Sequence, residues 1–397
     1  MDIFFVISGY LITESLQNIH QNQIPIVSFY KKRFYRIFPP LIFMVLFTLF
    51  LGSLVLSPSD LIDLSYSSLS AISLVSNFYF FKTSGYFASP SETKPLLHTW
   101  SLGIEEQFYL FYPLVFIWLL KTVSKKSYLI LILLMTMSFC FSVYATKRFS
   151  DHAFYLIDSR GWELMVGGIL FLIHKSFNLS DKQKALLWST GMALIFIPAF
   201  IYSTNTQFPG FYAIPPTLGA AFIIASQTHE LSSKLVFSNP LIVNTGNISY
   251  SLYLYTWPVL AFTKYLLGEE LKFPERVLLV VFALIMGLAS YYLIENNFRF
   301  KNKSRIKMGL LGIALGSALI SCLAIEVFNG LPSRLPPDVL RFRQSRDNIS
   351  FRNEVGLSDI SNKKVPVFGS IKSDRKLVLV GDSHAMAYMV GLNQACI

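Results

Sequence analysis

Apolar runs long enough to cross a lipid bilayer recur along this 397-residue chain, and they restrict its fold more than any other feature. A helix needs about 20 mainly apolar residues to span the hydrocarbon core. We expect crossings near Asp2–Leu16, Pro40–Leu56, Glu105–Leu120, Ser127–Ala145, Gly161–His174, Ala185–Tyr202, Ile214–Ser226, Ile248–Leu267, Arg276–Ile294 and Ile306–Phe328. The predicted fold class is therefore an all-α polytopic membrane bundle with about ten visible transmembrane helices.

The composition excludes an ordinary soluble domain. Hydrophobic residues make up 53% of the chain and charged residues 14%, against about 25% charged in soluble proteins. The net charge of +11 does not require a nucleic-acid partner, because membrane topology itself places basic residues at helix ends. Three scattered cysteines show no metal-ligand spacing, so no metal site is predicted. The expected surroundings are the lipid bilayer.

Basic residues also orient the predicted helices. Lys and Arg alternate between two sets of loops, with roughly twice as many in one set, which is therefore predicted to be cytoplasmic. The tail after Phe328 then lies outside, in the periplasm or the extracellular space. Met1 also lies outside, so we expect that a transmembrane segment preceding it is missing from this chain.

Six short motifs stand in a fixed order along the predicted helices: Asp2–Tyr10, Arg33–Pro39, His98–Tyr109, Arg160–Leu164, Ser249–Leu254 and Glu295–Arg299. Together they resemble the acyltransferase-3 family of membrane proteins. The resemblance implies an O-acyltransferase of the bacterial inner (plasma) membrane. Its donor substrate would be a cytoplasmic acyl-CoA, most simply acetyl-CoA, with no bound cofactor. Its acceptor would be a hydroxyl of a cell-envelope polysaccharide such as O-antigen, lipopolysaccharide or peptidoglycan.

Arg33 and Arg36 are one helical turn apart at the predicted cytoplasmic mouth of the second visible span. Their guanidinium groups can therefore converge on one anion. Positive-inside anchoring is the alternative explanation for arginines at this place. The family resemblance favours binding of the acyl-CoA donor, whose phosphates reach the same face.

Glu105 and Glu106 open another predicted span, near the outer surface in this topology. One carboxylate could neutralise the amides at the start of the helix, and the other would then face the interior for acid or base catalysis. The sequence does not say which is which. Arg160 and Glu163, one turn apart, are expected to pair with each other or with those carboxylates. The predicted supporting residues are His98, Trp100, Ser101, Gln107, Tyr109, Arg160 and Glu163.

The resemblance also implies a catalytic histidine in the helix that is expected to be missing before Met1. His98 is the one histidine next to the family motif here, and we interpret it as a surface or orienting residue rather than the base. Thr256 stands where related sequences often have histidine, and a threonine cannot accept a proton at neutral pH. Glu105 and Glu106 are therefore the carboxylates predicted to assist catalysis.

The tail suggests a second domain. We divide the chain into a membrane domain (1–328), a connecting region (329–375) and the start of an α/β domain (376–397). A short apolar run before Gly381-Asp382-Ser383-His384 predicts a strand followed by a sharp turn. This pattern resembles the first block of SGNH hydrolases, with Ser383 as nucleophile and the later blocks missing. A transporter of envelope precursors and a membrane-anchored esterase are the competing functional interpretations.

Overall fold

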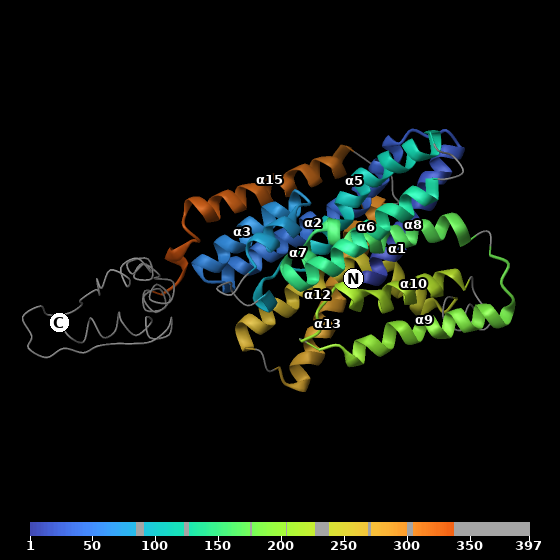
Figure 1. Cartoon of the computed structure of the whole chain (residues 1–397). Helices are drawn as coiled ribbons and strands as arrows, with labels where there is room; N and C mark the ends of the chain where they lie inside the picture. The colour runs from blue at the N-terminus through green and yellow to red at the C-terminus, as the bar shows by residue number, and fades with distance from the viewer. Residues whose placement is uncertain are drawn as a thin grey trace, which may run out of the picture. The chain divides into compact units, whose positions relative to one another are not determined.

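The structure is a computed structural model that describes residues 1–84, 91–122, 127–174, 177–203, 205–226, 238–268, 271–299 and 305–336. The regular elements in these ranges are helices (Figure 1). They are α1 (Asp2–Gln21), α2 (Val27–Val55), α3 (Pro58–Ile72), α4 (Ser76–Lys82), η1 (Ser91–Thr93), α5 (Thr99–Thr122), α6 (Ser127–Arg148), α7 (Ser150–Tyr155), α8 (Ile157–His174), α9 (Asp181–Ile201), η3 (Gly210–Ala213), α10 (Ile214–Ala225), α12 (Pro240–Leu267), α13 (Phe273–Ser290), η5 (Tyr291–Glu295), α14 (Asn296–Arg299), α15 (Arg305–Val327) and η6 (Pro332–Arg334).

The chain separates into two compact units. The first comprises Met1–Leu56 and Asp60–Val327 and holds the helical bundle. The second comprises Ser57–Ser59 and Phe328–Ile397, of which the structure describes the part up to residue 336. The predicted strand, turn and nucleophile Ser383 lie outside the described residues, and so does most of the predicted connecting region. The division into a connecting region and an SGNH-like start remains a prediction.

Glycines bring α1 and α8 into backbone contact. A Cβ added to Gly9 would overlap the carbonyl oxygen of Leu164, and a Cβ added to Gly167 would overlap that of Val6. Small residues at helix interfaces allow this close approach in membrane proteins, where dispersion replaces the hydrophobic effect as the driving force. The result is a tightly packed helix pair, and its first turns carry Asp2 and Arg160.

The same approach continues between α9 and α10, which lie side by side in Figure 1. Gly191 faces Gly219 there, and a Cβ on either would come within 3 Å of the other's carbonyl oxygen. α10 in turn contributes alanines to a core that it shares with α1 and α8, formed by Val6, Leu170, Ala220, Ala221 and Ala225. Small side chains thus hold this side of the bundle together.

A second core joins helices that are distant in sequence. Ile42 of α2 packs with Phe298 of α14 and with Leu311 and Ala314 of α15. Pro39 and Pro40 lie inside α2 just before this contact. Because proline has no N–H, each one removes a helical hydrogen bond to a carbonyl four residues earlier. Through Phe298, the end of the continuous helical segment α13–η5–α14 packs against the part of α2 that follows Arg33 and Arg36.

Five helices within the described ranges are long and apolar enough to cross a membrane: Val27–Val55, Leu129–Arg148, Asp181–Ile201, Phe273–Arg299 and Arg305–Val327. The predicted all-helical membrane bundle is confirmed in this coarser form, and the other expected crossings remain predictions. The helices outside this set include α1, α5 and α8, which carry polar residues of the motifs. Polar residues lower the apolarity of a segment even where they are buried among other helices.

Candidate functional site

The arginine motif and the glutamate motif meet inside the bundle. The guanidinium carbon of Arg33 lies 4.9 Å from the ring centroid of Tyr109 and 5.7 Å from that of Phe29. The Tyr109 hydroxyl donates a hydrogen bond of 2.9 Å to Glu105 Oε2 and lies 3.0 Å from Ser8 Oγ. Side chains from α1, α2 and α5 therefore form one connected group, which we call the inner cluster: Ser8, Arg33, Arg36, Glu105, Glu106 and Tyr109.

The prediction that the two motifs lie at opposite ends of the bundle is thus wrong. Arg33 is two turns inside α2, and Glu105 is two turns inside α5. The hydroxyl of Tyr30, one turn before Arg33, donates to the Leu110 carbonyl at 3.1 Å, which is a second contact between α2 and α5 at this level. The two motifs therefore meet in the interior of the bundle.

The two glutamates have different surroundings. Glu105 is held by Tyr109 and lies within electrostatic reach of both Arg33 and Arg36. Glu106 is close enough to interact with Arg33 and with Glu105, but its Oε1 is buried without a hydrogen-bond partner among the described residues. An unsatisfied buried oxygen is costly unless a ligand or a proton uses it. The two glutamates therefore differ in their contacts: Tyr109 holds Glu105, whereas Glu106 Oε1 has no partner among the described residues. Which of them acts in catalysis stays a prediction.

Gln107 points away from the arginines. Its Nε2 donates to Asn77 Oδ1 at 2.7 Å, and Asn77 Nδ2 donates to the Tyr155 carbonyl at 3.2 Å. Gly103 leaves room for this asparagine, because an added Cβ would come within 2.8 Å of its Oδ1. Gln107 thus ties α5 to α4 and α7, and it supports the site without joining the inner cluster.

His98 and Ser101 form a second group with Tyr253 of α12. The Tyr253 hydroxyl donates to the His98 carbonyl at 2.5 Å and lies 3.0 Å from Ser101 Oγ. The His98 ring packs edge-on against Tyr253, and neither ring nitrogen has a hydrogen-bond partner of good geometry among the residues that the structure describes. Burial lowers the pKa of His98 to about 3, partly opposed by the nearby backbone of Leu254. The alternative of a surface residue is wrong, because the side chain is buried. A neutral, buried ring is poorly suited to act as a base, and the orienting role stays a prediction.

Arg160 is fully buried at the start of α8. Its Nη2 lies 2.5 Å from Asp2 Oδ1, and its Nη1 lies 3.1 Å from Glu163 Oε1. Its guanidinium carbon also lies 5.8 Å from the Trp100 ring, with further rings close by: Phe5 and Phe208. The expected pairing with Glu163 is present, and Asp2 is an additional partner that the sequence did not indicate. We call Asp2, Trp100, Arg160 and Glu163 the outer cluster.

The two clusters share the same helices. Trp100 and Glu105 are both on α5, and Asp2 and Ser8 are both on α1. At about 1.5 Å per residue, each pair is separated by roughly 8–9 Å along its helix. The chain thus builds two adjacent polar centres, each with one or two arginines, two carboxylates and aromatic rings.

A sequence model described as an acyltransferase domain matches residues 1–296, which include five of the six motifs and both clusters. The chain belongs to the acyltransferase-3 family. The family assignment made from the motifs is therefore confirmed, and the matched region covers most of the helical bundle.

Several curated relatives of this acyltransferase-3 chain come from Staphylococcus aureus. The O-acetyltransferase OatA is 30% identical over 319 residues, covering 76% of this chain and 52% of its own length. A putative O-acetyltransferase of strain MRSA252 is 27% identical over 418 residues, covering 96% of this chain and 68% of its own. The chain thus spans about half to two thirds of the length of these relatives. No solved structure matches it.

Two tyrosines were missed as site residues by sequence reasoning. Tyr253 bridges His98 and Ser101, and the Tyr250 hydroxyl donates to the Ile37 carbonyl at 2.9 Å, next to Arg36. Both belong to the Ser249–Leu254 motif, which was noted only for its resemblance. Their spacing of three residues places them on one side of α12. That periodicity was the available signal.

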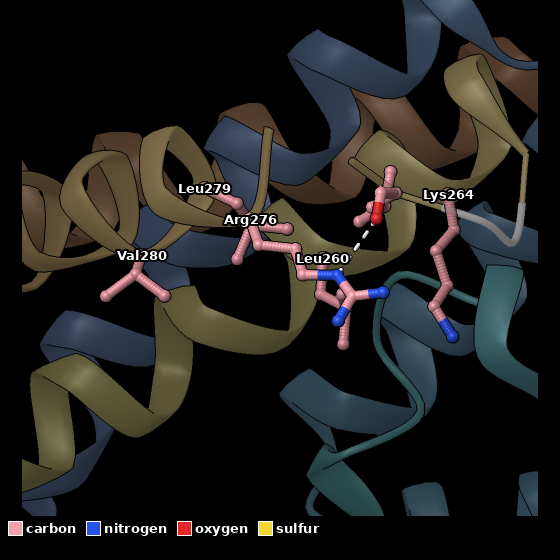
Figure 2. A pocket seen from close by; sticks show the side chains of 6 residues that line it. Leu260, Lys264, Arg276, Leu279 and Val280 are labelled. Carbon is pink, nitrogen blue, oxygen red and sulfur yellow. Dashed lines mark hydrogen bonds between the residues drawn. The ribbon is translucent and has the colours of Figure 1, made fainter. Parts of the chain in front are cut away.

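A separate hollow lies between α12 and α13, lined by Leu260, Lys264, Leu271, Arg276, Leu279 and Val280 (Figure 2). Lys264 pairs with Glu92, and Arg276 Nε donates to the Leu271 carbonyl at 2.9 Å. Lys264 is 14 residues from Tyr250, or about 21 Å along α12. The hollow contains none of the predicted site residues and is not part of the candidate site.

Proposed function

We propose that this acyltransferase-3 chain transfers an acyl group, most simply acetyl, from cytoplasmic acyl-CoA to a hydroxyl of a bacterial envelope polysaccharide. The supporting observation is the contact of Arg33 with Tyr109, which itself holds Glu105. This contact puts groups suited to an anionic donor beside groups suited to proton transfer. The relatives named O-acetyltransferases support the reaction class.

Arginine suits the donor side of this reaction. Its guanidinium is always charged and presents several N–H donors in a planar fork that matches phosphate oxygens. Arg33 is braced by aromatic rings on two sides, which limits the side-chain freedom that would be lost on binding. We propose that Arg33 and Arg36 hold the phosphates of coenzyme A and so place the thioester near Glu106.

Glu106 suits the proton-transfer side. In the proposed step, Glu106 removes the proton of the acceptor hydroxyl, and the oxygen of that hydroxyl attacks the carbonyl carbon of the thioester. The tetrahedral oxyanion then collapses, the C–S bond breaks, and the coenzyme A thiolate takes up a proton. The buried and unpartnered Oε1 is the atom available for this task. Glu105, fixed by Tyr109, would help to orient the reacting groups.

The acceptor would approach from the outer cluster. Trp100 lies five residues before Glu105 on α5, and its ring centroid is 5.8 Å from the guanidinium carbon of Arg160. An aromatic ring beside a charged group is suited to sugar binding. The tail, predicted to lie outside the plasma membrane, would complete or edit the transfer through Ser383. These assignments give each cluster one substrate.

The test uses the full chain in proteoliposomes with radiolabelled acetyl-CoA and either peptidoglycan fragments or lipopolysaccharide as acceptor. Base-labile acetyl groups should appear on one of the glycans. Arg33→Gln and Arg36→Gln should each raise the KM for the donor about 10-fold or more, because each removes a charge-assisted hydrogen bond of about 1.5–3 kcal/mol. Arg305→Gln is the matched control, since Arg305 is an exposed arginine at the start of α15.

Two results would contradict the proposal. One is glycan transport across the vesicle membrane without consumption of acetyl-CoA, which would favour the transporter interpretation. The other is glycan acetylation with an unchanged donor KM in both arginine variants, which would leave the reaction class standing and remove the arginines from the donor site.

A further inference from the structure

Glu295 is a buried carboxylate that the proposed function does not use. Its side chain is 0% exposed. Ser251 of α12 donates a hydrogen bond of 2.7 Å to Glu295 Oε2, and Arg299 Nη1 lies 3.5 Å from Glu295 Oε1. Both carboxylate oxygens are therefore engaged, one by a hydroxyl and the other by a cation. A buried carboxylate with this arrangement fixes the position of its cationic partner.

The backbone around Glu295 departs from a regular helix. Residues Tyr291–Glu295 form the π-helical turn η5 between α13 and α14. π-helical turns within longer helices are rare and are frequent at functional sites, because the inserted residue changes the direction of the following side chains. Here the turn lies directly before the segment that carries Arg299.

The segment after this turn packs against α2 beside the arginine motif. Phe298 shares a buried core with Ile42 of α2, Phe38 packs against the same core, and the Tyr250 hydroxyl donates to the Ile37 carbonyl. Arg36 is close enough to interact electrostatically with both Glu295 and Arg299, and Arg33 also acts on Arg299. Arg33 and Arg36, near the start of the chain, and Arg299, which follows them by more than 260 residues in sequence, therefore lie within electrostatic reach of one another.

Bringing like charges together raises their electrostatic energy, and a bound anion lowers it again. Glu295 offsets part of that cost, but the side chain of Arg299 is still 30% exposed, so its guanidinium has access to a ligand. Coenzyme A carries a diphosphate and a separate ribose 3′-phosphate, which together exceed what two guanidinium groups neutralise. A third cation close to the first two matches that excess charge.

We infer that Arg299 is a third phosphate-binding residue of the donor site, held in place by Glu295 through the π-helical turn and the Ser251 hydrogen bond. This inference rests on the proposed binding of acyl-CoA at Arg33 and Arg36. It adds a residue from the other end of the domain and a positioning role for Glu295. It also gives the Glu295–Arg299 motif a function that its sequence did not reveal.

The experiment measures the affinity of coenzyme A and of pantetheine for the full chain in lipid nanodiscs by calorimetry. Arg299→Gln should weaken coenzyme A binding about 10-fold or more, as expected for one charge-assisted contact to phosphate. Arg299→Lys should recover part of the loss, because it restores the charge without the fork. Arg305→Gln should bind like the wild-type chain. Glu295→Gln should weaken binding less than Arg299→Gln, because it loosens the cation without removing it.

Several outcomes separate this inference from the proposal beneath it. If Arg36→Gln weakens coenzyme A binding while Arg299→Gln matches the Arg305→Gln control, the inference is overturned and the donor site stands. If Arg33→Gln and Arg36→Gln also leave binding unchanged, the donor site itself fails. A purely structural role for Arg299 predicts that its loss affects pantetheine, which has no phosphates, as much as coenzyme A. Our inference predicts that the loss of Arg299 weakens the binding of coenzyme A and leaves that of pantetheine unchanged. If Arg299→Gln does not fold, the two ligands are compared with Arg299→Lys instead.

Discussion

Arg33 of α2 lies over the ring of Tyr109 of α5, with 4.9 Å between its guanidinium carbon and the ring centroid. Through the Tyr109 hydroxyl, this contact connects the arginine motif to Glu105. A cation over an aromatic ring contributes about 0.5–2 kcal/mol, more when water is excluded. Tyr109 therefore performs two separable tasks, bracing a cation with its ring and anchoring a carboxylate with its hydroxyl.

Tyr109→Phe separates these tasks, because it keeps the ring and removes the hydroxyl. Loss of a hydrogen bond to a charged group costs about 1.5–3 kcal/mol, so kcat should fall about 10- to 100-fold. The KM for acyl-CoA should change less than about threefold, since Arg33 keeps its support. Steady-state kinetics with Tyr144→Phe, an exposed tyrosine on α6, provide the control. A Tyr109→Phe chain with wild-type kcat would show that the anchoring of Glu105 is not needed.

Glu106→Gln tests the assignment of the proton acceptor. Glutamine has nearly the same shape but cannot take up a proton, so kcat should fall by about 10²–10⁴, the usual contribution of a general base. Glu105→Gln should have a smaller effect, because Glu105 already accepts a hydrogen bond from Tyr109. Thermal melting of both variants checks that the bundle is intact. An active Glu106→Gln chain beside an inactive Glu105→Gln chain would reverse the two roles.

Gly9→Ala should destabilise the bundle, because the new Cβ would overlap the Leu164 carbonyl and force α1 away from α8. Overpacking of this kind costs about 1–3 kcal/mol or more. The melting temperature in detergent should fall clearly for Gly9→Ala and for Gly167→Ala. Gly309→Ala on α15 is the matched control, since no atom of the described residues lies within 4 Å of its added Cβ. Equal melting temperatures for all three variants would mean that the close approach of α1 and α8 does not stabilise the protein.

His98 gives stability a defined pH dependence. Burial lowers its pKa in the folded chain to about 3, against 6.5 in the unfolded chain. Below pH 6.5 the unfolded chain binds a proton that the folded chain does not. Stability from this group is therefore complete above pH 6.5 and is lost as the pH falls toward 3. Between these two pH values the free energy of unfolding changes by at most about 1.4 kcal/mol per pH unit because of this group.

The measurement compares melting temperatures of the wild-type chain and His98→Gln between pH 7.5 and pH 5. The wild-type melting temperature should decrease more steeply, whatever the constant offset between the two chains. Other titrating groups contribute equally to both chains and cancel in the difference. Parallel curves would show that His98 is accessible to protons in the folded state.

Local patterns predicted much of this protein correctly. Apolar runs predicted a helical membrane bundle, and six ordered motifs predicted the family. The spacing of Arg160 and Glu163 predicted their ion pair, because residues three apart on a helix share a face. Each of these inferences depends on residues close together in the chain, where helix geometry alone fixes their relation.

Contacts between distant segments were not predictable in the same way. Nothing in the sequence showed that Asp2 pairs with Arg160, that Arg33 reaches Tyr109, or that Tyr253 bonds to the His98 carbonyl. Such contacts depend on which helix faces which, on the depth of each motif along its axis and on rotation about that axis. Packing sets these three quantities.

The sequence by itself determined the helices, the family motifs and the spacing of charged residues on each helix, because these follow from local periodicity and residue chemistry. Only the tertiary structure decided that the arginine and glutamate motifs share one centre and that Glu295 and Arg299 approach Arg36. It alone also showed that Glu106 Oε1 is buried with no hydrogen-bond partner in the described part of the chain. The physical reason is that backbone contact at glycines such as Gly9 fixes how deeply and at what rotation neighbouring helices meet. That geometry is a property of helix pairs and of no single segment.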